Sequence, residues 1–399
     1  MNRLKSDAIR AFLLHPGWSL FSLAGVFIFF FVLNRGGVIV FFWTGGIFLL
    51  GHLVHGDYGL DTLSTHQRVL VGICASLVLM SLAFSYPQTD THRLFRIGQM
   101  LIIVFCIEVI SRTELLEHAY KLFGVVLTVS IVCQFLTRSL FALPYGTWSN
   151  PHYLANFAIL TLPLVFYYFV TAPKPYNFIF LLLFAMDIEP VFRNASRPAF
   201  LALAVSTLFV ITFLTRGRYR LIGLLAICAS FFLVAVTNYA GFFDKLKELA
   251  ASLPNEERVQ IWKSSVMMLR DNSPAAWLVG NGIGSSLAVL PKYAIPDPLY
   301  QSFSFQHNFL LQVLFENGLI GTILVFGGLA FLLYILIRLS HRTKGFPRQL
   351  FINCITAVFL NCLIFTGLTV GVYSKYTLYP MGFIIGTVFV LAKEVRSDR

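Results

Sequence analysis

The sequence contains few charged residues and few groups that could bind a metal ion. Only 12% of its 399 residues are charged, and Asp and Glu together number 18. The carboxylates are scattered, with no Asp-x-Asp or His-x-x-x-His pairing, so the common metal-binding patterns are missing. The sequence therefore predicts no metal site and no cofactor.

Cysteine and intramembrane charge are also scarce. The six cysteines fall inside apolar stretches, which predicts packing roles and no disulfide framework: Cys74, Cys106, Cys133, Cys228, Cys354 and Cys362. The ionisable residues within apolar stretches are few for a secondary transporter, and no internal repeat supports one: Glu108, Asp187, Glu189 and Glu316. Asp187 and Glu189 are expected to pair with Arg193 or Arg197.

Apolar residues are abundant instead. They make up 57% of the chain, and the mean hydropathy is +0.76, which indicates that lipid surrounds most of the fold. Twelve stretches are long enough to cross a bilayer: 18–33, 38–54, 69–84, 97–111, 119–136, 153–170, 178–192, 198–214, 221–238, 308–337, 350–368 and 377–392. We expect an all-α integral membrane protein with about twelve transmembrane helices, and one polytopic domain over residues 1–399. No cleavage site follows the first stretch, so we expect it to be retained as a span.

The distribution of Lys and Arg predicts the orientation. An even number of spans puts both termini on one side, and 17 of the 30 Lys and Arg residues fall in the segments on that side. By the positive-inside rule both termini are expected in the cytoplasm of a bacterial inner membrane. The net charge of +12 is then explained by loops that meet anionic lipid headgroups, so we expect no nucleic-acid partner.

One long hydrophilic interval, residues 239–306, lies between the ninth and tenth spans on the external side, and we expect a helical subdomain there. Residues 242–249 form an amphipathic pattern typical of a helix on the membrane surface. Asn255 is expected to cap a second helix, with Arg258 facing a cavity. The apolar stripe of that helix is predicted to be Val259, Trp262, Val266 and Leu269. The glycine-rich residues 280–284 are expected to form a plain turn, since no strand precedes them.

Arg197 stands out among the external basic residues. Pro198 fits the first turn of a helix, which places Arg197 at its start. A guanidinium beside the positive end of a helix is unfavourable unless an anion is bound there, whereas an anion would be held by both. A headgroup-level arginine is the simpler alternative. Arg193, four residues earlier, is expected to face the same way.

His307 and Asn308 begin the tenth span, whose 30 residues would measure about 45 Å and should tilt or protrude outward. A neutral histidine at this interface could accept a proton from a hydroxyl group, and neighbouring arginines would favour its neutral form. A solvated interfacial histidine is the alternative. Asn308 is expected to cap the helix or to position a substrate.

The order of several short motifs resembles the O-antigen ligase and polymerase superfamily. These motifs are Ser149-Asn150-Pro151-His152-Tyr153, Ser196-Arg197-Pro198-Ala199, Glu257-Arg258-Val259, Gly280-Asn281-Gly282-Ile283-Gly284, His307-Asn308-Phe309 and Glu316-Asn317-Gly318-Leu319-Ile320-Gly321. Their order and spacing over residues 145–325 are more specific than any single motif. The chain departs from the pattern at His152, where many relatives have asparagine.

The resemblance implies a glycosyltransferase that works on the periplasmic side with an undecaprenyl-diphosphate-linked glycan as donor and the lipid A-core oligosaccharide as acceptor. His307, Arg197 and Arg258 are then expected to be catalytic, His307 as the base and the arginines on the diphosphate. Four further residues are expected to contact substrate: Arg193, Asn308, His152 and Asn150. The implied reaction inverts the anomeric carbon and needs no metal.

The leading functional hypothesis is an O-antigen ligase. A repeat-unit polymerase and a protein-directed oligosaccharyltransferase use the same chemistry on different acceptors, and they remain alternatives. A lipid-linked sugar flippase belongs to a different class, and it would not require His307.

Overall fold

The computed structural model describes residues 15–28, 41–47, 65–84, 89–113, 115–140, 150–193, 196–215, 217, 220–221, 224, 247, 257–293, 306–369 and 371–397. Every regular element in these residues is a helix, as predicted. Eight of the described helices are long and apolar enough to cross a membrane, so the chain is a multi-pass membrane protein. The number twelve stays a prediction because much of the stretches 18–33, 38–54 and 221–238 lies outside the described residues. The same holds for residues 242–249 and Asn255.

The helices follow the apolar stretches closely. In the first half of the chain they are α2 (Gly17–Phe27), α4 (Thr65–Phe84), α5 (Thr91–Ser111), α6 (Leu115–Leu140), α7 (Pro151–Thr171), α8 (Asn177–Arg193) and α9 (Arg197–Phe209), which the π-helical turn η3 (Val210–Leu214) continues. In the second half they are α12 (Glu257–Arg270), α13 (Pro274–Val279), α14 (Ser286–Tyr293), α15 (Phe309–Arg342), α16 (Phe346–Thr369) and α17 (Lys375–Ser397).

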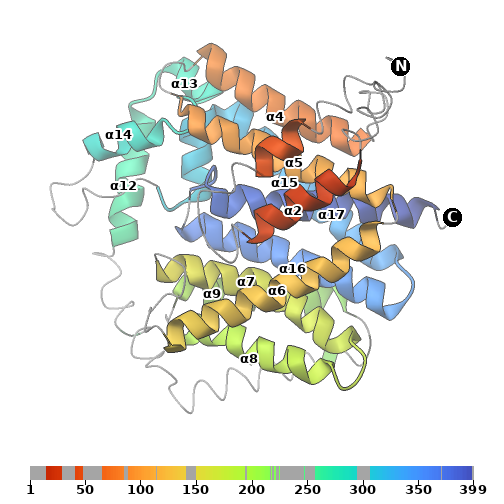
Figure 1. Cartoon of the computed structure of the whole chain (residues 1–399). Coiled ribbons are helices and arrows are strands. Elements are labelled where there is room, and N and C mark those ends of the chain that lie inside the picture. Colours follow the sequence, from red (N-terminus) through yellow and green to blue (C-terminus); the bar gives the residue numbers. More distant parts are fainter. Residues whose placement is uncertain are drawn as a thin grey trace, which may run out of the picture.

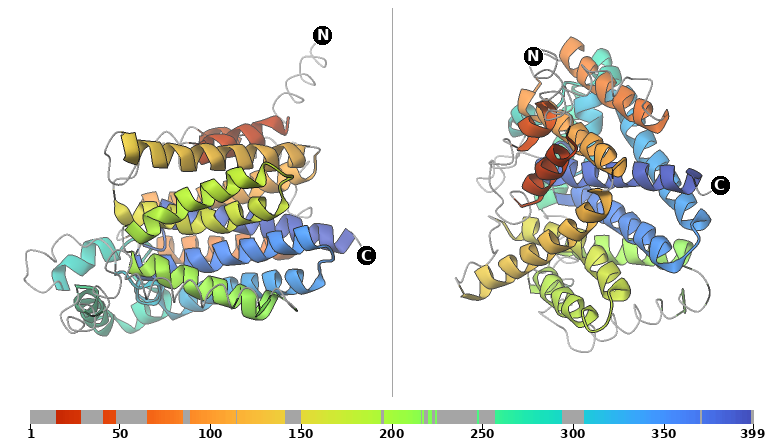
Figure 2. Two further views of the ribbon diagram at one scale, coloured as in Figure 1. Left: turned by 90° about the horizontal axis from the view of Figure 1, so that it is seen from below. Right: turned by 45° about the vertical axis from the view of Figure 1, so that its right-hand side comes forward.

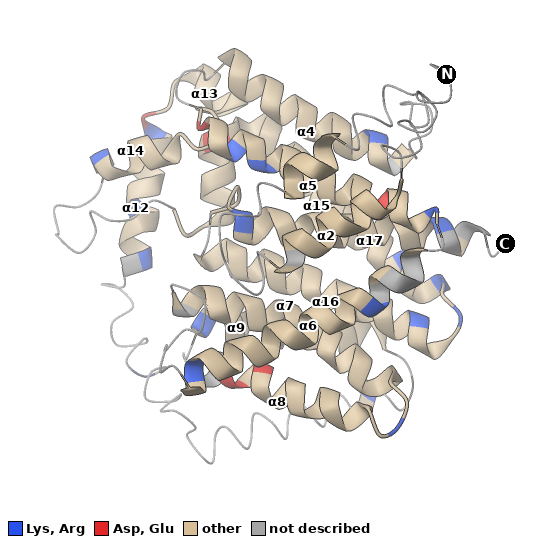
Figure 3. Cartoon of the chain, viewed as in Figure 1, with Lys and Arg blue, Asp and Glu red and all other residues tan. Residues whose placement is uncertain are grey.

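The long helices lie side by side in one bundle, and α12, α13 and α14 gather at one end of it (Figure 1; Figure 2). We call this end the subdomain end. The starts of α5, α7, α15 and α17 and the end of α16 lie at the same end. Lys and Arg concentrate towards the two ends of the bundle and are sparse on the helices between them (Figure 3), which fits a membrane-embedded middle.

Small residues let α17 pack tightly on α5. Gly382 and Gly386 are one helical turn apart, and a Cβ atom on Gly382 would lie 3.0 Å from the backbone oxygen of Met100. A Cβ on Gly386 would lie 2.8 Å from a side-chain carbon of Ile107. Such small-xxx-small spacing is typical of membrane helix pairs, whose association depends on close van der Waals contact. It fixes the start of α17 next to the start of α5.

Helix α15 is broken near its subdomain end. Gly318 has φ 63° and ψ −169°, which ends the regular hydrogen bonding of the preceding turn. The backbone oxygens of Phe315 and Glu316 accept instead from the backbone N–H groups of Asn281 (3.0 Å) and Gly282 (2.9 Å). An interrupted membrane helix is tolerated where protein groups satisfy the freed carbonyls, and the glycine-rich turn does so here. The long tenth span was predicted to tilt or protrude, and this break separates its first turns from the rest.

The described part of the predicted subdomain packs on those first turns. Its core consists of Ile261, Met268, Leu269, Leu290 and Phe315. The predicted stripe of α12 is wrong in its rotation, because Val266 is 47% exposed while Ser265 is buried on the same face as Ile261 and Met268. By hydropathy, Ser264 and Ser265 are expected to face solvent. Their small side chains instead allow close contact between helices. The Ser265 hydroxyl donates to the Ile261 backbone oxygen at 2.8 Å.

The two carboxylates of α8 have partners on neighbouring helices. Glu189 forms an ion pair with Arg138 at the end of α6. Asp187 accepts a hydrogen bond from the Thr161 hydroxyl of α7 at 2.6 Å. Their expected pairing with Arg193 or Arg197 stays a prediction, because the side chain of Arg193 lies outside the described residues. Helix α8 in fact places both carboxylates against its neighbours α6 and α7.

The break in α15 gives a stability prediction. A Cβ on Gly318 would lie 2.5 Å from the backbone of Leu278, and its backbone angles are open almost only to glycine. Gly318→Ala should therefore lower the free energy of unfolding by about 1–3 kcal/mol from strain alone. Gly327→Ala in the same helix is the control, because its Cβ would meet nothing within 4 Å, and it should stabilise by about 0.5–1 kcal/mol. Thermal unfolding in detergent measures both, and equal midpoints for the two variants would contradict this account.

Candidate functional site

His307 is held in a strained backbone conformation. Its φ is 48°, and it is the one residue other than glycine in the described part of the chain with φ in the left-handed region. Its backbone oxygen accepts a hydrogen bond from Trp262 Nε1 of α12 at 3.1 Å. A bulky residue stays in this region only when its surroundings fix it, and such residues concentrate at functional sites. The histidine singled out from the sequence is thus also a backbone outlier.

The imidazole of His307 lies in a largely buried, positively charged setting. Burial, then the charge of Arg258 and, as a smaller cause, His152 lower its pKa from 6.5 to about 4. A hydrogen bond with the backbone of Thr369 acts in the opposite direction. The structure therefore brings His307, Arg258 and His152 together at the subdomain end, from three elements far apart in sequence. At neutral pH the His307 ring is neutral, so it has a lone pair with which to accept a proton.

Two asparagines fix the backbone on either side of this group. The Asn308 side chain accepts from Leu311 N at 3.1 Å and caps α15, which confirms the capping prediction. The Asn150 side chain accepts from His152 N at 2.8 Å and caps α7. Both are ordinary helix caps. Their expected contacts with substrate remain predictions.

The start of α7 is also fixed against α17. The rings of Tyr153 and Tyr376 stack with their centroids 3.9 Å apart. One turn further along α7, Asn156 donates to the Tyr376 backbone oxygen at 3.3 Å. Among the described residues its own Oδ1 has no hydrogen-bond partner although it is buried, and both polar atoms of the Gln306 side chain share that property. This end of the bundle thus has hydrogen-bonding capacity beside His152 and His307.

Arg197 occupies the first turn of α9, as predicted. Its side chain is exposed, Pro198 follows it, and Ser196 at the N-cap makes no side-chain cap hydrogen bond. The first turn of α9 contains no acidic residue. The described residues that shift the pKa of His307 are Arg258, Thr369 and His152, and Arg197 is not among them. That Arg197 belongs to the same site as His307 therefore stays a prediction. Arg193 ends α8, and its side chain is outside the described part of the structure.

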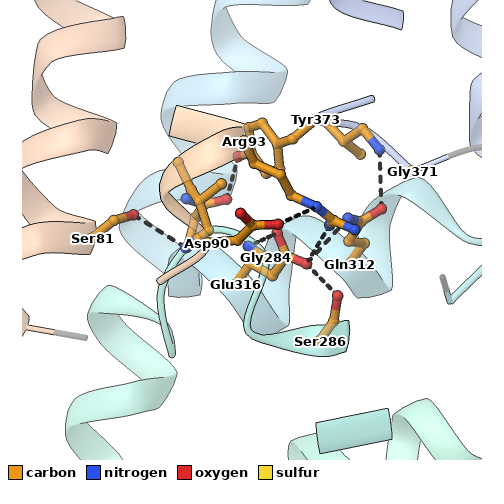
Figure 4. Close-up of polar contacts among 12 residues, drawn as sticks. Ser81, Asp90, Arg93, Gly284, Ser286, Gln312, Glu316, Gly371 and Tyr373 are labelled. Carbon is orange, nitrogen blue, oxygen red and sulfur yellow. Dashed lines mark hydrogen bonds and ion pairs between the residues drawn. The ribbon is translucent and has the colours of Figure 1, made fainter. Parts of the chain in front are cut away.

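A buried ionic cluster at the subdomain end was not anticipated from the sequence (Figure 4). Its centre is the Glu316 carboxylate of α15, which is 0% exposed. It accepts from Gly284 N (2.8 Å), from the Ser286 hydroxyl and from Gln312 Nε2 (3.1 Å), and it lies 3.5 Å from Arg93 NH1. Arg93 also lies 3.4 Å from the Asp90 carboxylate. The cluster thus joins α5, the glycine-rich turn and α15.

The same cluster reaches the turn between α16 and α17. Gln312 Oε1 accepts from Val372 N at 3.0 Å, and the Tyr373 hydroxyl donates to Asn317 Oδ1. Arg96 NH1 donates to the Tyr373 backbone oxygen at 3.1 Å. Burial and then the Glu316 charge raise the pKa of Tyr373 well above its ordinary value, so its hydroxyl keeps the proton that it donates.

One sequence signal could have pointed to this cluster. Glu316 is one of only four carboxylates in the apolar stretches, and Gln312 precedes it by one helical turn. A charged residue inside an apolar helix is costly unless a partner is provided. Arg93, the partner of Glu316, lies between two apolar stretches, so its place in the sequence does not indicate a buried ion pair.

Among the described residues no group of three or more His, Cys, Asp or Glu side chains is arranged to hold a metal ion. The site therefore consists of histidines, arginines and hydrogen-bonding groups. Such groups can accept a proton and stabilise an anion.

Comparison with known proteins agrees with this chemistry. Residues 178–326 match the model of the family described as O-antigen ligase. The matched region runs from α8 into α15 and contains Arg197, Arg258, His307 and Glu316. The resemblance drawn from the sequence motifs is thus confirmed over this region. No curated protein matches the chain.

The position of Arg258 beside His307 gives a titration prediction. Loss of this cation removes repulsion of the protonated imidazole, so Arg258→Ala should raise the pKa of His307 from about 4 towards 6.5. Arg270→Ala, at the other end of α12, is the control, and it should leave that pKa unchanged. NMR of selectively labelled histidines in detergent micelles measures both values. An unchanged pKa in the Arg258 variant would show that the two side chains are not neighbours.

Proposed function

We propose that the chain is an O-antigen ligase of a bacterial inner membrane. It transfers a glycan from undecaprenyl diphosphate to the lipid A-core oligosaccharide on the periplasmic face, with inversion and without a metal. The family match over residues 178–326 supports the reaction class. The observation that carries the proposal is the strained, largely buried and neutral His307 beside Arg258.

In the proposed reaction His307 is the general base. The acceptor hydroxyl oxygen attacks the anomeric carbon while its proton passes to the imidazole. The bond from that carbon to the diphosphate oxygen breaks, and undecaprenyl diphosphate leaves with the bonding electrons. The Thr369 backbone supports this role because a hydrogen bond to one ring nitrogen orients the ring and fixes its tautomer.

A pKa of about 4 makes His307 neutral but weakly basic in the free protein. Binding of the donor is proposed to raise the basicity of His307. Its diphosphate brings negative charge next to Arg258, which offsets the repulsion that lowers the pKa of His307. The base therefore becomes stronger only when the donor is in place, and it approaches the basicity that suits proton transfer near neutral pH.

The arginines act on the leaving group in this proposal. Arg258 reaches it from α12, and Arg197 adds its guanidinium to the positive end of α9, of which it is the first residue. Positive charge at this position is most valuable where negative charge develops on the departing diphosphate. Arg193, His152, Asn150 and Asn308 are proposed to line the substrate site.

The orientation follows from the charge distribution. The subdomain end is proposed to face the periplasm, with both termini in the cytoplasm, because the segments at the opposite end hold most of the Lys and Arg residues. Donor and acceptor then meet on the external face.

A repeat-unit polymerase or a protein-directed oligosaccharyltransferase would use the same base and arginines with another acceptor. The family match supports the chemistry that these candidates share. A gene deletion distinguishes them, since loss of a ligase leaves full-length polymer on its lipid carrier, whereas loss of a polymerase leaves at most one repeat on the core. A flippase gives no role to a buried neutral histidine.

The role of His307 predicts a specific kinetic pattern. His307→Ala should lower kcat by about 10²–10⁴-fold with little change in donor affinity, because a base acts mainly in the transition state. In the wild type, the acid limb of kcat/KM should follow the free-protein pKa of about 4, and that of kcat should lie at higher pH. Steady-state assays of the purified protein measure both limbs. Wild-type turnover in the alanine variant would remove His307 from the chemistry.

Arg197 is predicted to be needed for transfer and dispensable for membrane insertion. Arg197→Ala should cost about 3 kcal/mol of transition-state stabilisation, on the order of a hundredfold in rate. Arg197→Lys should restore little, since it keeps the charge and loses the bidentate geometry. Lipopolysaccharide ladders report transfer in cells, and membrane fractions report insertion. Normal ladders from the alanine variant would place Arg197 outside the site.

A further inference from the structure

His307 is held by two contacts from two different parts of the fold. Its backbone oxygen accepts from Trp262 of α12, and its ring bonds to the backbone of Thr369 at the end of α16. Neither contact comes from α15 itself, the helix that His307 precedes. The geometry of His307 therefore depends on what keeps α12 and the end of α16 in place beside α15.

Polar side chains on one face of α15 hold both α12 and the end of α16 in place. Towards the subdomain, the Glu316 carboxylate accepts from Gly284 N at 2.8 Å and from the Ser286 hydroxyl at the start of α14. Helix α14 in turn shares an apolar core with α12, through Leu290 and Ile261. Glu316 thus fixes the part of the chain that contains Trp262.

Towards α16 and α17, the link passes through Gln312. Its Nε2 donates to Glu316 at 3.1 Å, and its Oε1 accepts from Val372 N at 3.0 Å, three residues after Thr369. The carboxylate therefore orients the amide of Gln312, and that amide holds the turn after α16. Arg93, 3.5 Å away, places a positive charge beside this fully buried carboxyl group.

We propose that Glu316 is the positioning residue of the site, and that through its contacts with Arg93, Ser286 and Gln312 it holds the two contacts that fix His307. Glu316 does not touch the reacting atoms in this account. The kinetic part of the proposal rests on the proposed function, whereas the structural part does not.

The test uses Glu316→Gln in the full-length protein. Glutamine has the same shape, but its NH₂ group would face donors such as the Ser286 hydroxyl, Gly284 N–H or Gln312 N–H, so the set of contacts cannot all survive. The matched control is Glu108→Gln, which removes another buried carboxylate of a membrane helix, paired with Arg112 at 3.0 Å. Glu108 lies 15 residues along α5 from Arg93, about 22 Å at the helical rise.

The first measurement needs no knowledge of the reaction. Diethyl pyrocarbonate modifies neutral histidines, and mass spectrometry gives the rate at His307. We expect faster modification in Glu316→Gln than in the wild type or in Glu108→Gln, because the ring is no longer held against Thr369. Equal rates in all three proteins would overturn the proposal. Ser286→Ala removes one contact only, and it provides a milder variant with a change in the same direction should the glutamine protein fail to fold.

The second measurement uses transfer from the lipid-linked glycan. Glu316→Gln should lower kcat on the order of a hundredfold, as small misplacements of a catalytic group do, with the donor KM unchanged. In the His307→Ala background the further loss should be much smaller than a hundredfold, because the effect through the base is already absent. Losses that multiply would overturn the proposal. A wild-type protein that transfers no glycan would contradict the proposed function, while the labelling result would still decide the role of Glu316.

Discussion

The carbonyl groups freed at Gly318 are the constraint on which the subdomain end depends. A helix within a membrane protein cannot leave backbone oxygens without partners, since no bulk water reaches them. The backbone N–H groups of Asn281 and Gly282 satisfy the oxygens of Phe315 and Glu316. This requirement fixes the glycine-rich turn against α15. The turn in turn fixes α13 and α14, and α14 shares an apolar core with the helix that contains Trp262 and Arg258.

The helices themselves could be predicted from the sequence, because apolar length in a membrane is decided by bilayer thickness and by little else. The caps at Asn150 and Asn308 follow from local chemistry in the same way. The rotation of α12 could not be predicted, since hydropathy counts Ser264 and Ser265 as polar while packing treats them as small. A small residue on a buried face leaves no apolar signal.

Only some of the residues around His307 could be predicted from the sequence. The order of the sequence motifs singled out Arg258 and His307. Their proximity depends on the fold, and no spacing in the sequence predicts it. The sequence did not indicate that Thr369 and Trp262 contact His307, because Thr369 uses a backbone group and Trp262 an indole N–H. Arg93 and Arg138 lie outside the apolar stretches of the sequence, where basic residues are expected to meet solvent or headgroups. Both are buried partners of carboxylates, a role that depends on which helices become neighbours.

The interlocking of Gly280 with Gly318 has a consequence for biosynthesis. A Cβ on Gly318 would lie 2.5 Å from the backbone nitrogen of Gly280, and a Cβ on Gly280 would lie 2.3 Å from the backbone oxygen of Glu316. Each segment therefore takes its final shape only against its counterpart. The chain is made from the N-terminus, so the turn at residues 280–284 emerges before α15 and has to wait for it. The end of α16, which bonds to His307, and the turn after it, which bonds to Gln312, arrive later still. The candidate site is therefore among the last features to assemble, and a ribosome-bound chain that ends before residue 369 should be inserted in the membrane yet unable to orient His307.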